Sequence, residues 1–329
     1  MQKSVKLQIM IESILKNVLS GKDLEIEEAR GLSDPQKNDI LSLMRAANIV
    51  RREFCGNKMD ICSLINAKSG LCSEDCAFCA QSARSDADCE IYPLVGIDKI
   101  VNAARRAKKH GAKNFCIVIS GKGPTKDEFR NIKNAIENIN KTVGIKVDCS
   151  LGRLEIGMVR DLKALGVDRF NHNLETSGEF YPNICTTHSY DSRLSMIGML
   201  KEVGIKPCCG GIIGLGEGPE ERLNMAFALR KMNIDCVPIN ILNPRRGTPL
   251  ENIIPIEPLD AIRTIAIFRL ILPKVIIKVA GGRESGLRDM QAMAFMAGAN
   301  GMIIGGYLTT AGRPVDKDME MIKDLGFEL

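Results

Sequence analysis

Three cysteines lie close together in one short polar segment: Cys72, Cys76 and Cys79. Their spacing is C-x3-C-x2-C, and no fourth cysteine follows at a ferredoxin-type distance. Four cysteines close the coordination of an iron–sulfur cluster, so three leave one iron open for a further ligand. The alternative is a structural zinc site, which needs four nitrogen or sulfur ligands, typically in paired C-x2-C spacing. The spacing therefore favours an iron–sulfur cluster with one open iron.

A second set of cysteines is spread over three apolar runs that are predicted to be strands. Cys116 lies in the second run, Cys149 in the third, and Cys208 and Cys209 in the fifth. Three thiolates on separate strands of one barrel, with one further donor, would hold a second iron–sulfur cluster. Adjacent strand residues face opposite ways, so only one of Cys208 and Cys209 can point inward. The other cysteines are predicted to be structural: Cys55, Cys62, Cys89, Cys185 and Cys236.

Amide side chains mark the fourth and sixth predicted strands. Asn171, Asn173 and Glu175 alternate along the fourth and therefore share one face, and Asn240 ends the sixth. Amides both donate and accept hydrogen bonds, which suits a neutral, urea-like ligand. The sequence shows no Walker lysine, no H-E-x-x-H motif and no serine nucleophile elbow, so hydrolytic functions are not supported. No side-chain acid or base is expected to be catalytic.

A repeated alternation of strands and helices must position these residues. Eight strands are predicted at 61–65, 115–119, 145–149, 169–174, 205–213, 236–241, 275–279 and 302–304. Helices are predicted at 97–110, 126–139, 155–165, 189–203, 220–232, 259–272 and 287–297. This order and length predict an α/β fold, an (α/β)8 TIM-type barrel whose active site lies at the C-terminal strand ends. An open doubly wound sheet is the alternative.

The barrel is expected to make up most of the chain. Residues 1–57 are predicted to be an N-terminal helical cap, with one helix opened by Asp34 and Pro35. Residues 58–312 are predicted to form the barrel, and residues 313–329 a short polar C-terminal tail.

Composition excludes several classes of protein. The 329 residues carry a formal net charge of +5 and include only four Tyr and no Trp. Basic patches interleaved with aromatic residues are missing from the sequence, so no nucleic-acid partner is expected. Charged residues and a proline interrupt the most apolar stretch, 262–280, which argues against a membrane span. Twelve cysteines in a long, Lys/Glu-rich chain favour metal or catalytic roles over disulfides. We expect a cytoplasmic protein.

The cysteine loop, with Phe78 directly before its last cysteine, resembles that of the radical S-adenosylmethionine enzymes. In that superfamily the open iron of a [4Fe–4S] cluster binds S-adenosylmethionine, and one electron releases a 5′-deoxyadenosyl radical. Strings between about Asn66 and Thr310 resemble the biotin synthase family more closely. They are GLCSEDCAFCAQSAR, NFCIVISGKGP, RFNHNLETS, ICTTHSYDSR, CCGGIIGLGE, VPINIL, RGTPL, GGRES and YLTT.

The resemblance implies conversion of dethiobiotin to biotin, with sulfur inserted between two unactivated carbons. Cys72, Cys76 and Cys79 would hold the [4Fe–4S] cluster. The family pattern places an auxiliary, sulfur-donating cluster, [2Fe–2S] or larger, on a second set of ligands. These would be Cys116, Cys149, Cys208 and the guanidinium of Arg283.

The resemblance also implies the residues that bind S-adenosylmethionine. Arg193 and Glu175 would contact it, Asn173 would lie between it and the substrate, and Phe78 would lie near the adenine. The position of Glu175 is aspartate in the best-known members, which adds one methylene here.

For the substrate, Asn171 and Asn240, together with Asn173, would hold the ureido ring. Thr309 and Thr310 would hold the carboxylate tail. A homodimer and an electron donor such as flavodoxin or ferredoxin are implied as well. The alternatives are a related radical enzyme, as in hydrogenase cofactor maturation or methylornithine formation, and an iron–sulfur carrier without catalysis.

Overall fold

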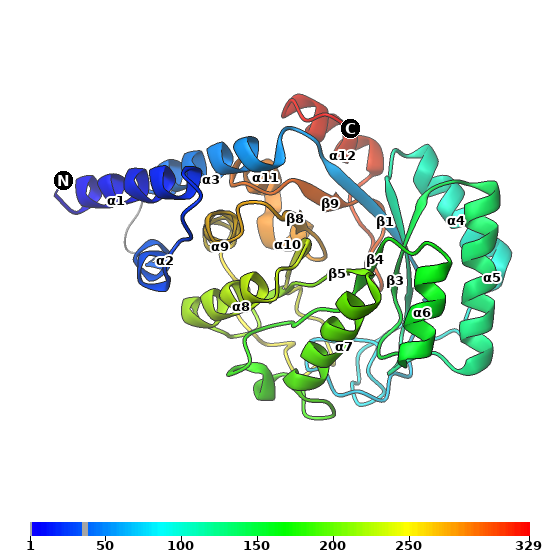
Figure 1. Ribbon diagram of the computed structural model, residues 1–329. Helices are drawn as coiled ribbons and strands as arrows, with labels where there is room; N and C mark the ends of the chain where they lie inside the picture. Colours follow the sequence, from blue (N-terminus) through cyan, green and yellow to red (C-terminus); the bar gives the residue numbers. More distant parts are fainter. Residues whose placement is uncertain (1, 35–38) are drawn as a thin grey trace.

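Parallel strands form the centre of the molecule (Figure 1). The computed structural model describes residues 2–34 and 39–329. The strands are β1 (Asp60–Lys68), β2 (Asn114–Ile119), β3 (Lys146–Ser150), β4 (Arg169–Asn171), β5 (Lys206–Cys208), β6 (Gly211–Ile213), β7 (Cys236–Ile241), β8 (Ile276–Val279) and β9 (Gly301–Ile303). Their order is β5-β4-β3-β2-β1-β9-β8-β7-β6, and an additional β5–β7 pairing closes the sheet. The predicted TIM-type barrel is confirmed.

Strands β5 and β6 occupy a single position in the barrel. Cys208 pairs with Cys236 and Gly211 pairs with Ile239, so both strands keep the same register against β7. A Cβ atom on Gly210, between them, would lie 1.9 Å from a backbone oxygen of β7. The interruption therefore lets two backbones approach closely, and the barrel has the eight strand positions that the sequence predicts.

Helices surround the barrel. They are α4 (Ile97–Lys109), α5 (Lys126–Thr142), α6 (Ile156–Ala164), α7 (Tyr190–Val203), α8 (Pro219–Lys231), α9 (Pro258–Ile271), α10 (Arg283–Leu287) and α11 (Gln291–Met296). Helix α4 shows why they form: Ile100, Ala104 and Ala107 recur at helical spacing and are buried against the sheet. The helix predicted at 287–297 is interrupted, because Arg288 has a positive φ of 52° that ends α10.

Three helices precede the barrel: α1 (Gln2–Leu19), α2 (Ile26–Ser33) and α3 (Ile40–Cys55). Helix α3 packs against α9, and α2 packs against α8 and α9 (Figure 1). The side chain of Asp39 caps α3 by accepting a hydrogen bond from the Ser42 amide. The helix start predicted at Pro35 lies outside the described residues.

The predicted polar tail is an ordered part of the fold. Residues 313–329 contain the helix α12 (Val315–Asp324), on which Asp318 and Ile322 are buried. Beyond it, Phe327 is also buried, and the Met59 amide donates to the carbonyl of Glu328. These contacts fasten the end of the chain to the start of β1. Among the described residues, no helix is long and apolar enough to cross a membrane.

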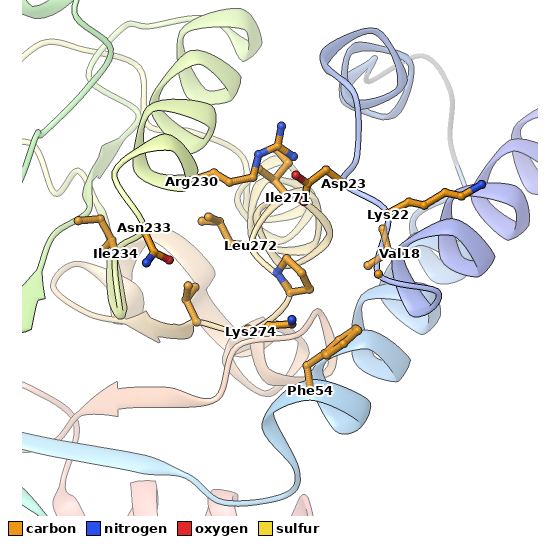
Figure 2. Close-up of a pocket in the computed structure, with 13 residues that line it drawn as sticks. Val18, Lys22, Asp23, Phe54, Arg230, Asn233, Ile234, Ile271, Leu272 and Lys274 are labelled. Atoms are coloured by element: carbon orange, nitrogen blue, oxygen red, sulfur yellow. The ribbon is translucent and has the colours of Figure 1, made fainter.

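A cavity of about 200 Å³ lies between the N-terminal helices and the barrel base (Figure 2). Phe54 and Leu272 form part of its wall, and Lys22, Asp23 and Arg230 supply charge. It is next to the N-terminal ends of β7 and β8 and contains no thiol, whereas barrel chemistry takes place at the opposite strand ends.

Candidate functional site

The cysteine loop follows β1 directly and is shaped by its own backbone. Gly70, with a φ of 77°, turns the chain out of the strand. The Cys72 amide donates to the carbonyl of Gln81 (2.9 Å), and the Ala83 amide donates to the carbonyl of Cys72 (2.7 Å). The side-chain oxygen of Gln81 also accepts from Ser69 Oγ (3.1 Å). These bonds hold the loop at the C-terminal edge of the barrel.

The loop cysteines are free thiols with part of their surface exposed. Burial raises the pKa of Cys79 to about 11, and burial together with Cys185 raises the pKa of Cys76 well above its ordinary value. Such thiols ionise when a bound cation supplies positive charge. The loop therefore fits the three-thiolate iron–sulfur site that its spacing predicts.

A cavity of about 200 Å³, here called the loop cavity, opens beside these thiols. It is lined by Cys72, Glu74, Cys76, Ile119, Gly121, Lys122, Ser150, Gly152, Arg153, Asn171, His172, Asn173, Glu175, His188 and Arg193. Asn171, Asn173 and Glu175 reach the same cavity, as predicted. Strand alternation is not the reason, because β4 ends at Asn171 and His172 lines the cavity as well.

Arg193 is the central cation of the loop cavity. Its Nε donates to Tyr181 Oη (2.6 Å) and its Nη1 donates to the carbonyl of Asn173 (2.9 Å), while Glu175 Oε1 lies 3.7 Å away. Burial raises the pKa of Glu175, and Arg193 opposes that rise. Glu175 has a φ of 71°. Phe78 does not line this cavity; it packs beside Cys76 in an apolar cluster with Tyr181.

Two histidines in the loop cavity were not predicted as site residues. His188 Nδ1 donates to Glu74 Oε2 (2.6 Å), and its Nε2 accepts from Arg193 Nη2 (2.9 Å). His172 is buried, and its Nε2 has no partner within the described part of the chain. Burial first, and then Arg193, lower the pKa of His172 to about 3, so it is neutral. The only sequence signal was that the chain contains three histidines.

A second cavity, of about 280 Å³, occupies the barrel interior and is here called the lumen cavity. It is lined by Cys62, Leu64, Cys116, Val118, Ser150, Asn171, Asn173, Cys208, Pro238, Asn240, Lys278, Ala280, Gly281, Ile303, Tyr307, Leu308, Thr309 and Thr310. Ser150, Asn171 and Asn173 belong to both cavities. The two cavities therefore adjoin at these three side chains.

The predicted substrate residues all line the lumen cavity, but their amides differ in what they already bind. Asn171 Nδ2 donates to Cys116 Sγ (3.1 Å), while its Oδ1 is buried without a partner among the described residues. Asn240 Oδ1 accepts from the Gly281 amide (2.9 Å), and its Nδ2 donates to the carbonyl of Gly211 (3.2 Å). Asn171 is thus the amide with a free acceptor.

Four thiols lie inside the barrel as two pairs. Cys62 and Cys116 pack together, and Cys208 Sγ lies 3.2 Å from the Sγ of Cys236. Cys62 and Cys236, predicted to be structural, are therefore inside the barrel with the predicted ligands. Cys209 packs in the outer core, so Cys208 is the inward member of its pair.

Cys149, a predicted ligand, lies on the wrong face of its strand. It pairs with Ile117, and both side chains pack in the core between the barrel and its helices. Its neighbour Asp148 pairs with Cys116, and residues paired in this way point to the same side of a sheet. The third strand therefore presents a carboxyl group to the lumen in place of a thiol.

Arg283, the fourth predicted ligand, does not reach either cavity. It lies in α10, fully buried, with Nη2 2.5 Å from Asp318 Oδ2 in α12 and 3.3 Å from Glu284 Oε1. Its Nε donates to Tyr307 Oη (3.0 Å). These partners satisfy the guanidinium, so Arg283 anchors the C-terminal helix to the barrel.

Lys278 is the cation that does line the lumen cavity. Its Nζ lies 2.8 Å from Asp60 Oδ1, and Arg169 donates to the same carboxylate with both terminal nitrogens (3.0 and 2.8 Å). Burial lowers the pKa of Lys278, but Cys236, Cys62 and Asp60 raise it well above its ordinary value. The buried ammonium in turn lowers the pKa of each thiol around it.

Two family models match most of the chain. The Radical SAM superfamily covers residues 68–229, which include the cysteine loop. The Biotin and Thiamin Synthesis associated domain covers residues 238–328.

Solved structures share the fold at low sequence identity. Methylornithine synthase is 20% identical with a TM-score of 0.84, covering 96% of each chain. HydG, a maturase of the [FeFe]-hydrogenase, is 16% identical with a TM-score of 0.83, covering 99% of this chain and 77% of that one.

Curated relatives are much closer in sequence. The biotin synthase of Clostridium acetobutylicum is 47% identical over 97% of this chain and 98% of its own length. That of Geotalea daltonii is 42% identical, over 98% of both chains. The chain therefore belongs to the biotin synthase family of radical S-adenosylmethionine enzymes, which use S-adenosylmethionine and a [4Fe–4S] cluster.

Proposed function

We propose that this chain converts dethiobiotin to biotin by inserting sulfur between two carbons of the substrate. The observation that carries the proposal is the junction of the two cavities at Ser150, Asn171 and Asn173. One cavity contains the cysteine loop and Arg193, and the other contains thiols and amides. A radical source and a sulfur source on either side of a bound substrate need this arrangement.

The loop cavity is proposed to bind S-adenosylmethionine next to the cluster on Cys72, Cys76 and Cys79. Arg193 and Glu175 supply one positive and one negative group there, and a zwitterionic amino acid and ribose hydroxyls require such partners. Asn173 is proposed to contact both ligands because it lines both cavities. Phe78, which lies in the same apolar cluster as Cys76, is proposed to lie near the adenine.

The lumen cavity is proposed to bind dethiobiotin. The unpartnered Oδ1 of Asn171 can accept one ureido N–H, and leaving it unpaired costs about 1–3 kcal/mol. Two hydrogen bonds to backbone groups hold the side chain of Asn240 in place. Its Oδ1 and its Nδ2 can each take one more partner. Thr309 and Thr310 are proposed to bind the carboxylate tail.

The auxiliary cluster is proposed to rest on the four lumen thiols, Cys62, Cys116, Cys208 and Cys236. Four cysteines close the coordination of either a [2Fe–2S] or a [4Fe–4S] cluster, and the donor chemistry suits both. Lys278, in place of an arginine ligand, would offset the charge of the thiolates. This set replaces the ligand set that includes Cys149 and Arg283.

When bound, the cofactors supply a 5′-deoxyadenosyl radical on one side and sulfur on the other. The chain's residues position the substrate and exclude water rather than transfer protons. His172 and Glu175, which line the loop cavity, are themselves buried. We further propose that the protein forms a homodimer, is cytoplasmic and accepts electrons from a flavodoxin or ferredoxin. The exposed apolar side chains Val5, Ile9 and Leu41 on α1 and α3 are candidates for the dimer contact.

Dethiobiotin-dependent cleavage of S-adenosylmethionine tests the substrate proposal. In the anaerobically reconstituted protein, dethiobiotin should stimulate deoxyadenosine formation, and biotin should appear. A protein that contains both clusters but shows no response to dethiobiotin would rule the substrate out.

Paired cysteine variants test the auxiliary ligands. Cys236→Ala should lose the iron and sulfide of the auxiliary cluster, whereas Cys149→Ala, equally buried but on the outer face, should keep them. Loss in Cys149→Ala with retention in Cys236→Ala would refute the four-thiol set. Iron and sulfide counts and visible absorption report this without any assay of activity.

A further inference from the structure

His188 lies between the cysteine loop and Arg193 and forms a hydrogen bond to each. Its Nδ1 donates to Glu74 Oε2 (2.6 Å), and its Nε2 accepts from Arg193 Nη2 (2.9 Å). The side chains of His188 and Glu74 are only 10% and 12% exposed, so water competes little for these bonds. Two consecutive hydrogen bonds therefore connect a residue of the loop to the central cation of the loop cavity.

The charge state of the imidazole sets the direction of both bonds. Burial first, and then Arg193, lower the pKa of His188, whereas Glu74 opposes that decrease. A neutral imidazole has one N–H and one lone pair. Because a guanidinium can only donate, the lone pair faces Arg193 and the N–H faces Glu74. The ring thus holds one guanidinium nitrogen without adding charge to the cavity.

The segment before His188 is itself fastened to the cysteine loop. The carboxylate of Asp75, which lies between two of the loop cysteines, accepts from the amides of Thr186 (3.0 Å) and Thr187 (3.1 Å). It also accepts from Thr187 Oγ1 (2.9 Å). These bonds hold the segment against the loop and thereby determine where His188 lies.

Each of the three guanidinium nitrogens of Arg193 donates to a different residue. Besides the bond to His188, Nε donates to Tyr181 Oη (2.6 Å) and Nη1 donates to the carbonyl of Asn173 (2.9 Å). These bonds take three of the five N–H groups. One N–H remains on each terminal nitrogen, and two such groups suit the recognition of a carboxylate. Their direction depends on the bonds that fix the guanidinium plane.

We propose that His188 is a positioning residue for S-adenosylmethionine: by bonding both Glu74 and Arg193, it fixes the Arg193 guanidinium relative to the cysteine loop. The inference rests on the contact between Arg193 and S-adenosylmethionine that is part of the proposed function. A guanidinium that is already oriented loses less conformational freedom when an anion binds, so the affinity is higher. His188 itself transfers no proton and touches no reacting atom.

Affinity for S-adenosylmethionine, measured without dethiobiotin, tests this role. Equilibrium dialysis of the anaerobically reconstituted protein gives the dissociation constant, and iron and sulfide counts verify that each variant contains its clusters. His188→Ala should weaken binding about tenfold with the clusters retained, because a bond to a charged group is lost. His110→Ala, which removes an exposed histidine, is the control and should bind as the parent does. Unchanged affinity in His188→Ala would overturn the inference.

Two amide variants separate the bonds of His188. His188→Asn keeps an N–H for Glu74 but ends before the position of Nε2, so it should bind as weakly as His188→Ala. His188→Gln places an oxygen where Nε2 accepts from Arg193, so it should recover part of the affinity. The opposite order would refute positioning through Arg193. His188→Asn also decides the question if His188→Ala fails to assemble the loop cluster, because it keeps the bond to the loop.

A double-mutant cycle tests the connection to the loop. Glu74→Ala should weaken binding in the parent but have no further effect in His188→Ala, because the two residues act in series. Additive effects would show that they act independently and would refute the connection. Arg193→Met tests the underlying contact: weak binding in Arg193→Met with parent-like binding in His188→Ala would refute the positioning role alone. Since dethiobiotin is absent throughout, failure here is distinct from failure of the proposed function.

Discussion

Cys208 and Cys236 face each other inside the barrel, with their Sγ atoms 3.2 Å apart and in register on β5 and β7. The hydrogen bond from Cys208 raises its own pKa and lowers that of Cys236. Cys236 therefore loses its proton more readily than Cys208, and the buried ammonium of Lys278 also lowers its pKa. Among the four lumen thiols, Cys236 is the one whose pKa is lowered, whereas those of Cys62, Cys116 and Cys208 are raised.

The loop thiols and the lumen thiols should serve separate clusters. Cys76→Ala should abolish deoxyadenosine formation, because three thiolates are the minimum for the loop site, and should leave the absorption of the auxiliary cluster in place. Deoxyadenosine is measured by chromatography and the clusters by visible absorption. Loss of both clusters from folded Cys76→Ala protein would contradict the two-site arrangement.

The free acceptor of Asn171 should determine substrate affinity. Asn171→Ala should weaken the response to dethiobiotin about ten- to hundredfold, because an unpaired ureido N–H costs about 1–3 kcal/mol. The concentration of dethiobiotin that gives half-maximal S-adenosylmethionine cleavage measures this. Asn138→Ala, on the exposed side of α5, is the control and should behave as the parent. An unchanged response in Asn171→Ala would remove this residue from the substrate site.

Arg283 should contribute to stability and not to the iron content. Arg283→Met leaves the carboxylate of Asp318 buried without its main partner, which costs about 3–5 kcal/mol. Urea unfolding measures the loss, and Arg283→Met/Asp318→Leu should recover part of it. Lys317→Met, which breaks an exposed ion pair in α12, should leave the stability nearly unchanged. Loss of auxiliary iron from folded Arg283→Met protein would restore the arginine as a ligand.

His172 should make the fold sensitive to mild acid. Its pKa in the folded chain is about 3, below the ordinary 6.5, so the stabilisation is present above about pH 6.5 and is lost as the pH falls towards 3. At pH 5 His172 is protonated in the unfolded chain but not in the folded chain. This difference lowers the free energy of unfolding by about 2 kcal/mol. His172→Gln should reduce the loss of unfolding free energy between pH 7 and pH 5 by about this amount, measured by urea unfolding of the iron-free chain. His110→Gln, at an exposed site, should not; equal pH dependence in both variants would contradict the burial argument.

Local patterns in the sequence were sufficient to predict the barrel. Alternating strand and helix periodicity located the strand positions, and the split at Cys209 and Gly210 did not disturb the register. The interrupted helix at Arg288 and the packed helix α12 were not foreseen. The packing of α12 depends on contacts distant in sequence, such as the Arg283–Asp318 pair, which residue composition does not reveal.

Local motifs do not identify the cysteines that face the lumen. Cys149 was included because it lies in a strand, but its side is set by the register that pairs it with Ile117. A shift of one residue reverses the face of every side chain in a strand. Cys62 and Cys236 were overlooked for the same reason, because no local motif distinguishes an inward cysteine from an outward one.

The shared wall of the two cavities has a thermodynamic consequence. Because Ser150, Asn171 and Asn173 line both, a ligand that orders these side chains in one cavity changes the free energy of binding in the other. Linkage is reciprocal, so the factor by which dethiobiotin changes the affinity for S-adenosylmethionine must equal the factor in the reverse direction. Asn173, whose Oδ1 is fixed by the Gly210 amide (3.2 Å) while its Nδ2 contacts Glu175 Oε2 (3.3 Å), is placed to carry that coupling. An inhibitor that occupies both cavities would therefore include this coupling free energy in its own binding.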